Sequence, residues 1–518
     1  MSPVDRRTFL GTAAVALWGA RVSRAWAAET AAPLSVEELT IAELRRFSAR
    51  ELTGMYLARI ATLDKSVGSI IELNPDALAI ADALDRQRKR GPLHGIPILI
   101  KDNIDTADRM HTTAGSLALA DNIAARDAHV VKRLREAGAV ILGKTNLSEW
   151  ANFRSTHSTS GWSARGGLTR NPYALDRNAC GSSSGTGAAI AASFAAVGVG
   201  SETDGSIVCP SSANGLVGLK PTLGLISRSG IIPISHSQDT AGPMARTVTD
   251  AAILLGAMTG IDSLDAVTAT SRNHVQADYT QFLDANGLRG ARIGVARKYF
   301  GFHDGVDKLM NEALDVIKQL GATLVDPADM ETTGKYDDTE LEVLLYEFKA
   351  DLNAYLAQLS PNVKARTLAD LIQFNKDNRE REMPYFGQEL FERAEKKGPL
   401  TSDEYKKALA KNHRMSREEG IDAVMKKHKL DALVAPTGGP VWCTDLVNGD
   451  HYTGGYSSAS AVAGYPHITV PAGHVFGLPV GLSFFAGAWS EPALLKYAFA
   501  FEQATKARRA PTFRTAAA

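Results

Sequence analysis

Two serine-containing turns carry the residue types of a nucleophilic hydrolase. Ser182 lies in a glycine-bounded serine cluster, residues 181–185, and Ser206 follows Gly205 at the end of a short apolar strand. A glycine before a serine permits a tight turn that projects the hydroxyl, and such a turn leaves backbone N–H groups without partners. Free N–H groups beside a serine can stabilise a developing oxyanion. The stretch therefore predicts the centre of a serine hydrolase.

A serine nucleophile also needs a base within hydrogen-bond reach, and neither turn contains a histidine. Lys101 closes the apolar run Ile96–Ile100, which is typical of a buried strand with a proline near its start. This lysine stands at the carboxyl end of a strand, where open α/β sheets bind their ligands. Taken alone, such a lysine is more often a surface residue. Acting through a second serine, a neutral lysine could supply the missing base.

The order of elements along the chain predicts the fold that must position these residues. Strands are expected at residues 96–100, 139–142, 196–200, 291–296, 322–325, 430–435, 467–471 and 482–485. Helices are expected at residues 41–63, 127–137, 247–258, 306–320, 457–463 and 492–506, the first of them introduced by a capping box at Ser35. This alternation predicts an α/β protein: a single large α/β/α domain with a central mixed twisted sheet flanked by helices. Two charged helical regions, 340–374 and 403–427, are expected to cover one face of the domain or to form a cap over the cleft.

The N-terminal residues have the pattern of a targeting segment. Arg6 and Arg7 precede a modestly apolar run, residues 11–20, and Ala25-Trp26-Ala27 offers a cleavage site. Twin arginines before a weak apolar run resemble a bacterial twin-arginine export signal. We therefore expect residues 1–27 to be removed and residues 28–518 to form one mature domain in the periplasm or outside the cell. The run is too short to anchor the protein stably in a membrane.

The composition narrows the classes of partner and cofactor. Lysines plus arginines and aspartates plus glutamates both number 57, so the zero net charge argues against a nucleic-acid partner. The histidines lack metal-binding spacing, including His94 and His111 on either side of the Lys101 strand, and we expect neither a metal nor a cofactor. Cys180 and Cys209 flank the two serine turns and could lie close together. Buried free thiols are nevertheless favoured over a disulfide, because three cysteines without close spacing form no disulfide framework.

Three segments of the chain resemble the amidase signature family. They are residues 95–103 (GIPILIKDN), the serine cluster 181–185 (GSSSG) and residues 204–210 (DGSIVCP), which residues 218–222 (GLKPT) continue. The separation of Ser182 from Ser206 fits the same family, and the similarity extends over nearly the whole mature chain. The resemblance implies the amidase signature fold.

The resemblance also implies a Ser-Ser-Lys triad. Ser206 would be the nucleophile, Ser182 the bridging serine after a cis peptide bond, and Lys101 the ultimate base. The backbone N–H groups of Thr203, Asp204 and Gly205 would form the oxyanion hole. For this chemistry Lys101 must be neutral, so burial must lower its pKa, and activity is expected to be shifted to alkaline pH. Asp102 should point to the opposite face of the strand and leave the lysine uncharged.

Within the family, residues 148–153 and 161–167 look most like the bacterial peptide amidase branch, which converts C-terminal carboxamides of peptides to acids and ammonia. The expected substrate is a peptide amide or a small-molecule amide. A general aliphatic or aryl amide or ester hydrolase of the same family is the alternative. Residues 300–397 carry the weakest resemblance and are expected to shape access to the cleft.

Three other interpretations use the same residues. The cluster 181–185 also fits the G-x-S-x-G elbow of an α/β-hydrolase, with Ser183 as nucleophile and a downstream histidine such as His236, His451 or His467. That elbow needs a preceding strand, whereas residues 168–179 have the polar composition of a loop. A binding protein that has lost its chemistry is disfavoured by the intact triad residues. The part of an amidotransferase that works on charged tRNA is disfavoured by the export signal and by the absence of net positive charge.

Overall fold

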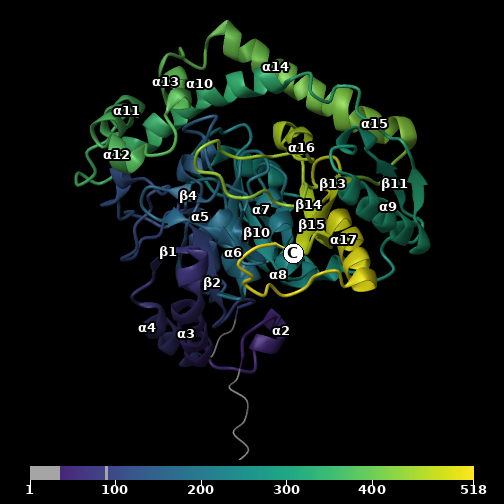
Figure 1. The fold of residues 1–518 in the computed structure, drawn as a ribbon, viewed down its shortest axis with the longest axis horizontal. Coiled ribbons are helices and arrows are strands. Elements are labelled where there is room, and N and C mark those ends of the chain that lie inside the picture. Colours follow the sequence, from purple (N-terminus) through teal and green to yellow (C-terminus); the bar gives the residue numbers. More distant parts are fainter. Residues whose placement is uncertain (1–34, 88–90, 518) are drawn as a thin grey trace, which may run out of the picture. The chain divides into compact units, whose positions relative to one another are not determined.

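A mixed sheet organises the chain from residue 38 onward (Figure 1), in a computed structural model that describes residues 35–87 and 91–517. The expected export signal, residues 1–27, lies outside the described residues. The strands of the sheet are β1 (Ile70–Leu73), β2 (Pro97–Lys101), β3 (Val140–Thr145), β8 (Val197–Glu202), β9 (Val217–Lys220), β10 (Thr240–Ala245), β11 (Arg292–Val295), β12 (Thr323–Val325), β13 (Ala432–Pro436), β14 (His467–Val475) and β15 (Leu478–Phe485). They are arranged in the order β1-β3-β2-β8-β10-β9-β14-β15-β13-β11-β12. The predicted α/β class with a central mixed sheet is thereby confirmed.

The two strands that lead to the predicted site residues, β2 and β8, are parallel neighbours in the sheet. β2 is parallel to both β3 and β8, with Ile98 opposite Val197 and Ile100 opposite Val199. β10 is antiparallel to β8 and to β9. Parallel neighbours end at the same edge of a sheet, so the residues that follow β2 and β8 meet there.

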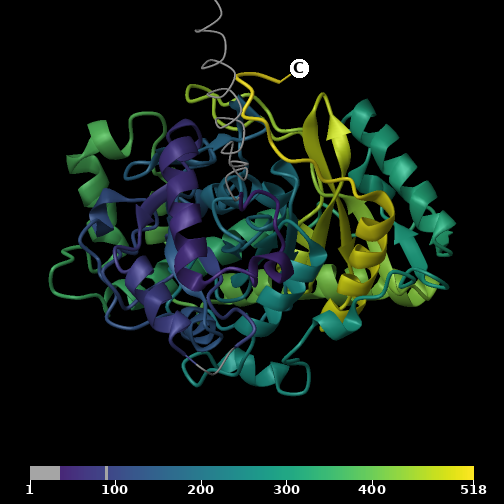
Figure 2. The ribbon, with the colours of Figure 1, turned by 90° about the horizontal axis from the view of Figure 1, so that it is seen from below.

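Helices on either side of the sheet bury its apolar strands. They include α3 (Ala49–Val67), α4 (Ala77–Asp85), α5 (His129–Glu136), α6 (Ser184–Ala191), α7 (Val208–Ala213), α8 (Val248–Met258), α9 (Asp304–Gln319), α16 (Ser458–Ala463) and α17 (Glu491–Thr505). Every residue of α6 is buried, which its small side chains allow because they let neighbouring backbones approach closely. In Figure 2 the yellow α17 lies beside the C-terminal hairpin β14–β15, with which it is in contact.

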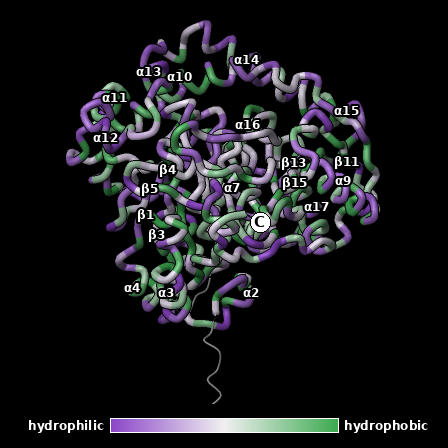
Figure 3. Tube along the Cα trace, viewed as in Figure 1, coloured by the Kyte–Doolittle hydropathy of each residue, from purple (hydrophilic) through white to green (hydrophobic). Residues whose placement is uncertain are grey.

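The two charged regions form a layer of long and short helices. They are α10 (Asp337–Leu356), α11 (Leu368–Asp377), α12 (Arg379–Glu382), α13 (Glu389–Glu395), α14 (Asp403–Ser416) and α15 (Asp422–His428). α10 and α14 pack against each other, and both are drawn in green in Figure 1. Hydrophilic residues prevail along α12 and α14 (Figure 3), while Leu345, Phe348 and Phe391 of this layer belong to a buried cluster that also contains Trp150.

Some local predictions differ from the structure. The first helix is not introduced by Ser35: Thr40 caps the short α2 (Ile41–Leu44) and Ser48 caps α3, each with a capping box. Residues 168–179 are not simply a loop, since β6 (Arg170–Asn171) and β7 (Ala174–Asn178) pair within them. β10 escaped prediction because its sequence, TAGPMA, has weak strand propensity; its two partner strands override that preference.

No helix within the described ranges has both the length and the apolar character needed to cross a membrane.

Candidate active site

The ends of β2 and β8 bring the predicted site residues to one edge of the sheet. Lys101 is the last residue of β2, and Ser206 lies between β8 and α7. Ser182 lies two residues before α6, which packs against β2 and β8. The Ser183 N–H donates to the Ser206 carbonyl oxygen at 3.2 Å, so the two serine turns touch.

The amine of Lys101 is wholly enclosed by hydroxyl and carbonyl oxygens. Its Nζ lies 2.7 Å from Ser182 Oγ, 2.9 Å from Ser201 Oγ and 3.2 Å from the Ser201 carbonyl oxygen. Lys101 is fully buried, and this desolvation lowers its pKa to about 7 even though Asp239 and Glu202 act to raise it. An amine with such a pKa is uncharged over much of the neutral and alkaline range, so it can accept a proton from the Ser182 hydroxyl.

Asp102 faces away from this amine, as alternation along a strand predicts. Its Oδ2 accepts hydrogen bonds from the Thr113 hydroxyl and, at 3.4 Å, from the Gly115 N–H. The cations that lower its pKa, against the larger effect of burial, are Lys144 and Arg165. Lys101 therefore owes little of its charge state to its neighbour in sequence.

The two serines differ in what their hydroxyls contact. The Gly181–Ser182 peptide bond is cis, as the family resemblance implied. Ser182 is buried with its hydroxyl against Lys101, whereas Ser206 is half-buried and its hydroxyl forms no hydrogen bond to any described residue. Ser206 is thus the serine that remains available to an incoming group.

Backbone donors surround Ser206. Across the described part of the chain, no protein acceptor takes a hydrogen bond from the N–H groups of residues 203–206. The next two N–H groups, of Ile207 and Val208, donate to the Glu202 carboxylate at 2.7 and 3.1 Å. Gly205 has a φ of +77°, and a Cβ there would lie 3.3 Å from Ser457 Oγ. This loop, residues 203–206, is called the oxyanion loop below because its free N–H groups fit that role.

The hydroxyl of Ser183, the alternative nucleophile, is already engaged in hydrogen bonds with the backbone. The Ser183 hydroxyl is buried, donates to the Ser201 carbonyl at 3.1 Å and accepts from the Ser201 N–H at 3.2 Å. Of the histidines considered, His467 is buried against Ser483 Oγ at 2.6 Å, and burial lowers its pKa to about 3. The α/β-hydrolase interpretation therefore lacks a free hydroxyl on Ser183, and His467 contacts Ser483 rather than Ser183.

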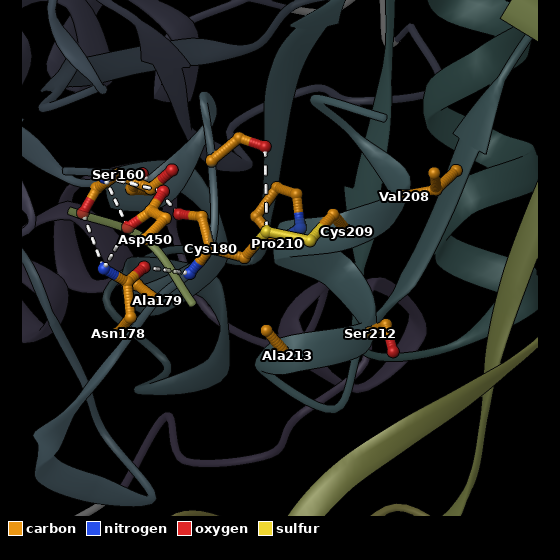
Figure 4. The surroundings of a disulfide bond; sticks show 12 residues. Ser160, Asn178, Ala179, Cys180, Val208, Cys209, Pro210, Ser212, Ala213 and Asp450 are labelled. Atoms are coloured by element: carbon orange, nitrogen blue, oxygen red, sulfur yellow. Dashed lines mark hydrogen bonds between the residues drawn. A yellow bond between two sulfur atoms is a disulfide. The ribbon is translucent and has the colours of Figure 1, made fainter. Parts of the chain in front are cut away.

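The prediction of free thiols at Cys180 and Cys209 is wrong, because these residues form a disulfide (Figure 4). Their Cα atoms are 6.0 Å apart although they are separated by 29 positions in the chain. The bond joins the residue two before Ser182 to the residue three after Ser206. Only the meeting of the two turns in space reveals this pairing; sequence spacing does not. Cys443 is free and exposed.

Several site residues were not anticipated. Ser201, which contacts the Lys101 amine, also accepts a hydrogen bond from Asn103 Nδ2 at 2.9 Å. Asp239 accepts from Thr203 Oγ1 at 2.5 Å, and desolvation raises its pKa to about 6. Asn103 and Ser201 stand inside or beside the recognised motifs and could have been noticed there. Asp239 carries no sequence signal, because only the folding of the 234–240 segment brings it to the loop.

A cavity of about 200 Å³ opens beside Ser182 and Thr203. Apolar side chains form much of its wall: Ala151, Ile231, Ile232, Pro233, Ile234 and Leu264. A larger cavity of about 700 Å³ adjoins it and shares five of its residues: Ser229, Ile231, Pro233, Leu264 and Asp351. Together they have the apolar walls with a few polar groups that small-molecule and peptide sites use.

One cluster of titratable groups lies beside this cavity, and two of its members, His236 and Asp351, line it. Ligand atoms of His236, Glu347 and Asp351 lie within 4.8 Å of one another. His236 Nδ1 is 2.8 Å from Asp351 Oδ2, and Glu347 accepts from the Tyr405 hydroxyl at 2.6 Å. The contact between His236 and Asp351 fastens α10 to the loop that carries Asp239, and the bond between Tyr405 and Glu347 joins α10 to α14.

Comparisons with known proteins agree with this geometry. The family model described as Amidase matches residues 51–495. A probable amidase of Arabidopsis thaliana is 43% identical over 498 residues, covering 92% of each chain. The crystal structure of an amidase family protein from Bacillus anthracis is 38% identical, with a TM-score of 0.83, and covers 92% of this chain and 93% of its own. The solved structure of native peptide amidase from Stenotrophomonas maltophilia is 50% identical, with a TM-score of 0.88, and covers 92% of this chain and 99% of its own. The chain therefore belongs to the amidase signature family, whose members hydrolyse amides through a Ser-Ser-Lys triad.

Proposed function

We propose that this amidase hydrolyses the C-terminal carboxamides of peptides to free acids and ammonia. The observation that carries the proposal is the enclosed Lys101 amine, 2.7 Å from Ser182 Oγ and with its pKa lowered to about 7. It supplies a base that needs no histidine.

The first half of the reaction moves one proton along the triad. Lys101 takes the hydroxyl proton of Ser182 while Ser182 takes that of Ser206. The Ser206 oxygen attacks the amide carbon, and the N–H groups of Thr203, Asp204 and Gly205 stabilise the negative charge that forms on the carbonyl oxygen. The neutral carbonyl group thus becomes a tetrahedral oxyanion, and the amine of Lys101 becomes an ammonium ion.

The second half reverses these transfers. The oxyanion collapses, the carbon–nitrogen bond breaks, and the proton held by Lys101 returns through Ser182 to the leaving nitrogen, which departs as ammonia. A water molecule then attacks the acyl-enzyme and gives its proton back along the same route, which releases the acid and restores Ser206.

Two features favour a peptide amide over a simple amide. The cavity beside Ser182 continues into the larger one, so the space beside the triad exceeds what a small amide would fill. The similarity to a peptide amidase at 50% identity over nearly the whole of both chains points the same way.

The test is ammonia release from a panel of amides of increasing size. We expect kcat/KM to rise from acetamide, benzamide and glutamine through amino-acid amides to di- and tripeptide amides, because the longer acyl groups reach the larger cavity. Ser206→Ala should abolish turnover of every substrate, whereas Ser183→Ala should leave measurable activity. Preference for the small amides over the peptide amides would instead support the general amide hydrolase.

We also propose that the enzyme works outside the cytoplasm, exported by a twin-arginine signal. Support comes from Arg6, Arg7 and the Ala25-Trp26-Ala27 site in the sequence.

A further inference from the structure

Helix α10 reaches the oxyanion loop through one buried carboxyl group. Glu340, in the first turn of α10, is only 8% exposed. Its carboxyl faces that of Asp204, the second residue of the loop, and the nearby Asp204 carboxyl acts to raise the pKa of Glu340. Two carboxylates cannot share a hydrogen bond unless one of them carries a proton.

The neighbouring hydrogen bonds show where that proton is needed. Asp204 Oδ2 accepts from the Ser458 hydroxyl at 2.6 Å. Asp204 Oδ1 is also buried, yet no nitrogen or hydroxyl of a described residue donates to it. A buried carboxylate oxygen without a donor is costly, so a proton on the Glu340 carboxyl is the donor that completes the set.

Glu340 also acts on the residue before Asp204. Gln238 Nε2 donates to Glu340 Oε1 at 2.9 Å and to the Thr203 carbonyl at 3.3 Å. The side chain of Thr203 is held separately by Asp239. One carboxyl on α10 therefore contacts, directly or through Gln238, two consecutive residues whose N–H groups would face the oxyanion.

We propose that Glu340 is a positioning residue that holds the oxyanion loop in its catalytic shape by sharing a proton with Asp204 and by fixing Gln238 against the Thr203 carbonyl. The proposal rests on the proposed role of residues 203–206 as the oxyanion hole. Its consequence is an alkaline limit to activity: once the shared proton is lost, two adjacent carboxylates repel each other and the loop loses its anchor on α10.

The surroundings of the pair favour the protonated form at neutral pH. Burial comes first, followed by the negative charges of Asp204 and Asp337, and together they raise the pKa of Glu340 well above its usual range. The titratable groups that face Asp204 are also the buried Glu202 and Lys220 and four tyrosines, namely Tyr299, Tyr336, Tyr452 and Tyr456. Burial raises the pKa values of the tyrosines, so they stay neutral. Burial lowers the pKa of Lys220 to about 8, so this lysine supplies less compensating charge as the pH rises.

The experiment compares pH profiles of kcat and KM for the wild type, Glu340→Gln and Glu340→Ala. A glutamine amide donates to Asp204 and accepts from Gln238 without titrating. We expect E340Q to retain kcat within about threefold at neutral pH but to lose the alkaline decline that the wild type shows. E340A should lower kcat about tenfold or more with little change in KM, because loosening oxyanion donors costs catalysis more than binding.

Glu342→Gln is the matched control, since it makes the same change two residues along α10, where Glu342 pairs with Lys397. It should keep the wild-type profile. An unchanged alkaline limb in E340Q, an undiminished kcat in E340A or a wild type with no alkaline decline would each overturn the proposal.

A second measurement needs no substrate. Infrared difference spectra of the free enzyme across the alkaline range should show a protonated carboxyl band that is lost on titration in the wild type and is absent in E340Q. If no amide is hydrolysed but this band is found, the proposed function fails while the shared proton stands. If amides are hydrolysed and the band is missing, the positioning role of Glu340 fails alone.

Discussion

At the scale of single residues, two opposing effects decide the charge state of Lys101: burial lowers its pKa, and two acidic neighbours raise it. Asp239 and Glu202 both stabilise an ammonium ion, but complete removal from water outweighs them and leaves the pKa at about 7. Desolvation raises the pKa values of both acids, which weakens their attraction for the protonated lysine. A substantial fraction of Lys101 is therefore neutral at a pH near 7, as the proposed role of a base requires.

This value predicts the acid limb of the activity. Lys101 must be neutral to accept a proton, so kcat/KM should be highest above pH 7 and fall about tenfold per pH unit below it. The measurement is kcat/KM for a peptide amide between pH 5 and 9. Lys101→Arg, which carries a permanent charge at this position, should be inactive throughout. A profile that stays flat down to pH 5 would contradict a lysine base.

At the scale of elements, the disulfide fixes α6 and α7 relative to each other at the point where the serine turns meet. Cys180 precedes the turn of Ser182, and Cys209 lies in the first turn of α7, which follows Ser206. The N–H of Cys180 donates to Asn178 Oδ1 at 2.7 Å, and Asn178 in turn contacts Ser160 and Asp450 (Figure 4). The bond thus belongs to a hydrogen-bonded network that extends to Ser160 and Asp450.

Removing the bond should destabilise the protein. A cross-link that closes a loop of 29 positions restricts the unfolded chain, and its loss costs about 3.6 kcal/mol by the chain-entropy relation. The double variant Cys180→Ser/Cys209→Ser should therefore unfold at lower denaturant concentration, with reduced kcat. Cys443→Ser, at the exposed free thiol, is the control and should unfold like the wild type. Identical unfolding of the double variant and the wild type would show that the cross-link contributes nothing.

At the scale of the whole molecule, export and folding are linked by the proposed signal. A twin-arginine signal carries folded proteins, and an enzyme with a disulfide beside its nucleophile suits an oxidising compartment. Replacing Arg6 and Arg7 by lysines should leave the enzyme in the cytoplasm as an unprocessed chain, whereas the wild type should appear in the periplasmic fraction without residues 1–27. Equal distribution of the two proteins after fractionation would remove the support for export.

Much of the fold could be predicted because the elements are locally consistent. β2 and β13 are largely continuous apolar runs, and α9 and α17 are bounded by turn residues close to where the structure begins and ends them. β10 and the split between α10 and α11 could not be read from the sequence. In β10 the partner strands override weak propensity, and in the charged regions the helix ends are set by packing between helices rather than by a strong local signal.

The sequence by itself determined the family and the α/β class and predicted Lys101, Ser182 and Ser206 as the triad, because closely spaced motifs and apolar periodicity are local properties of the chain. Only the tertiary structure decided that Cys180 pairs with Cys209, that Asp239 holds Thr203, and that Glu340 meets Asp204. Each of these contacts joins residues from different elements. The pKa of a buried carboxyl or amine, and the pairing of a thiol, depend on the neighbours and the exclusion of solvent that folding alone provides.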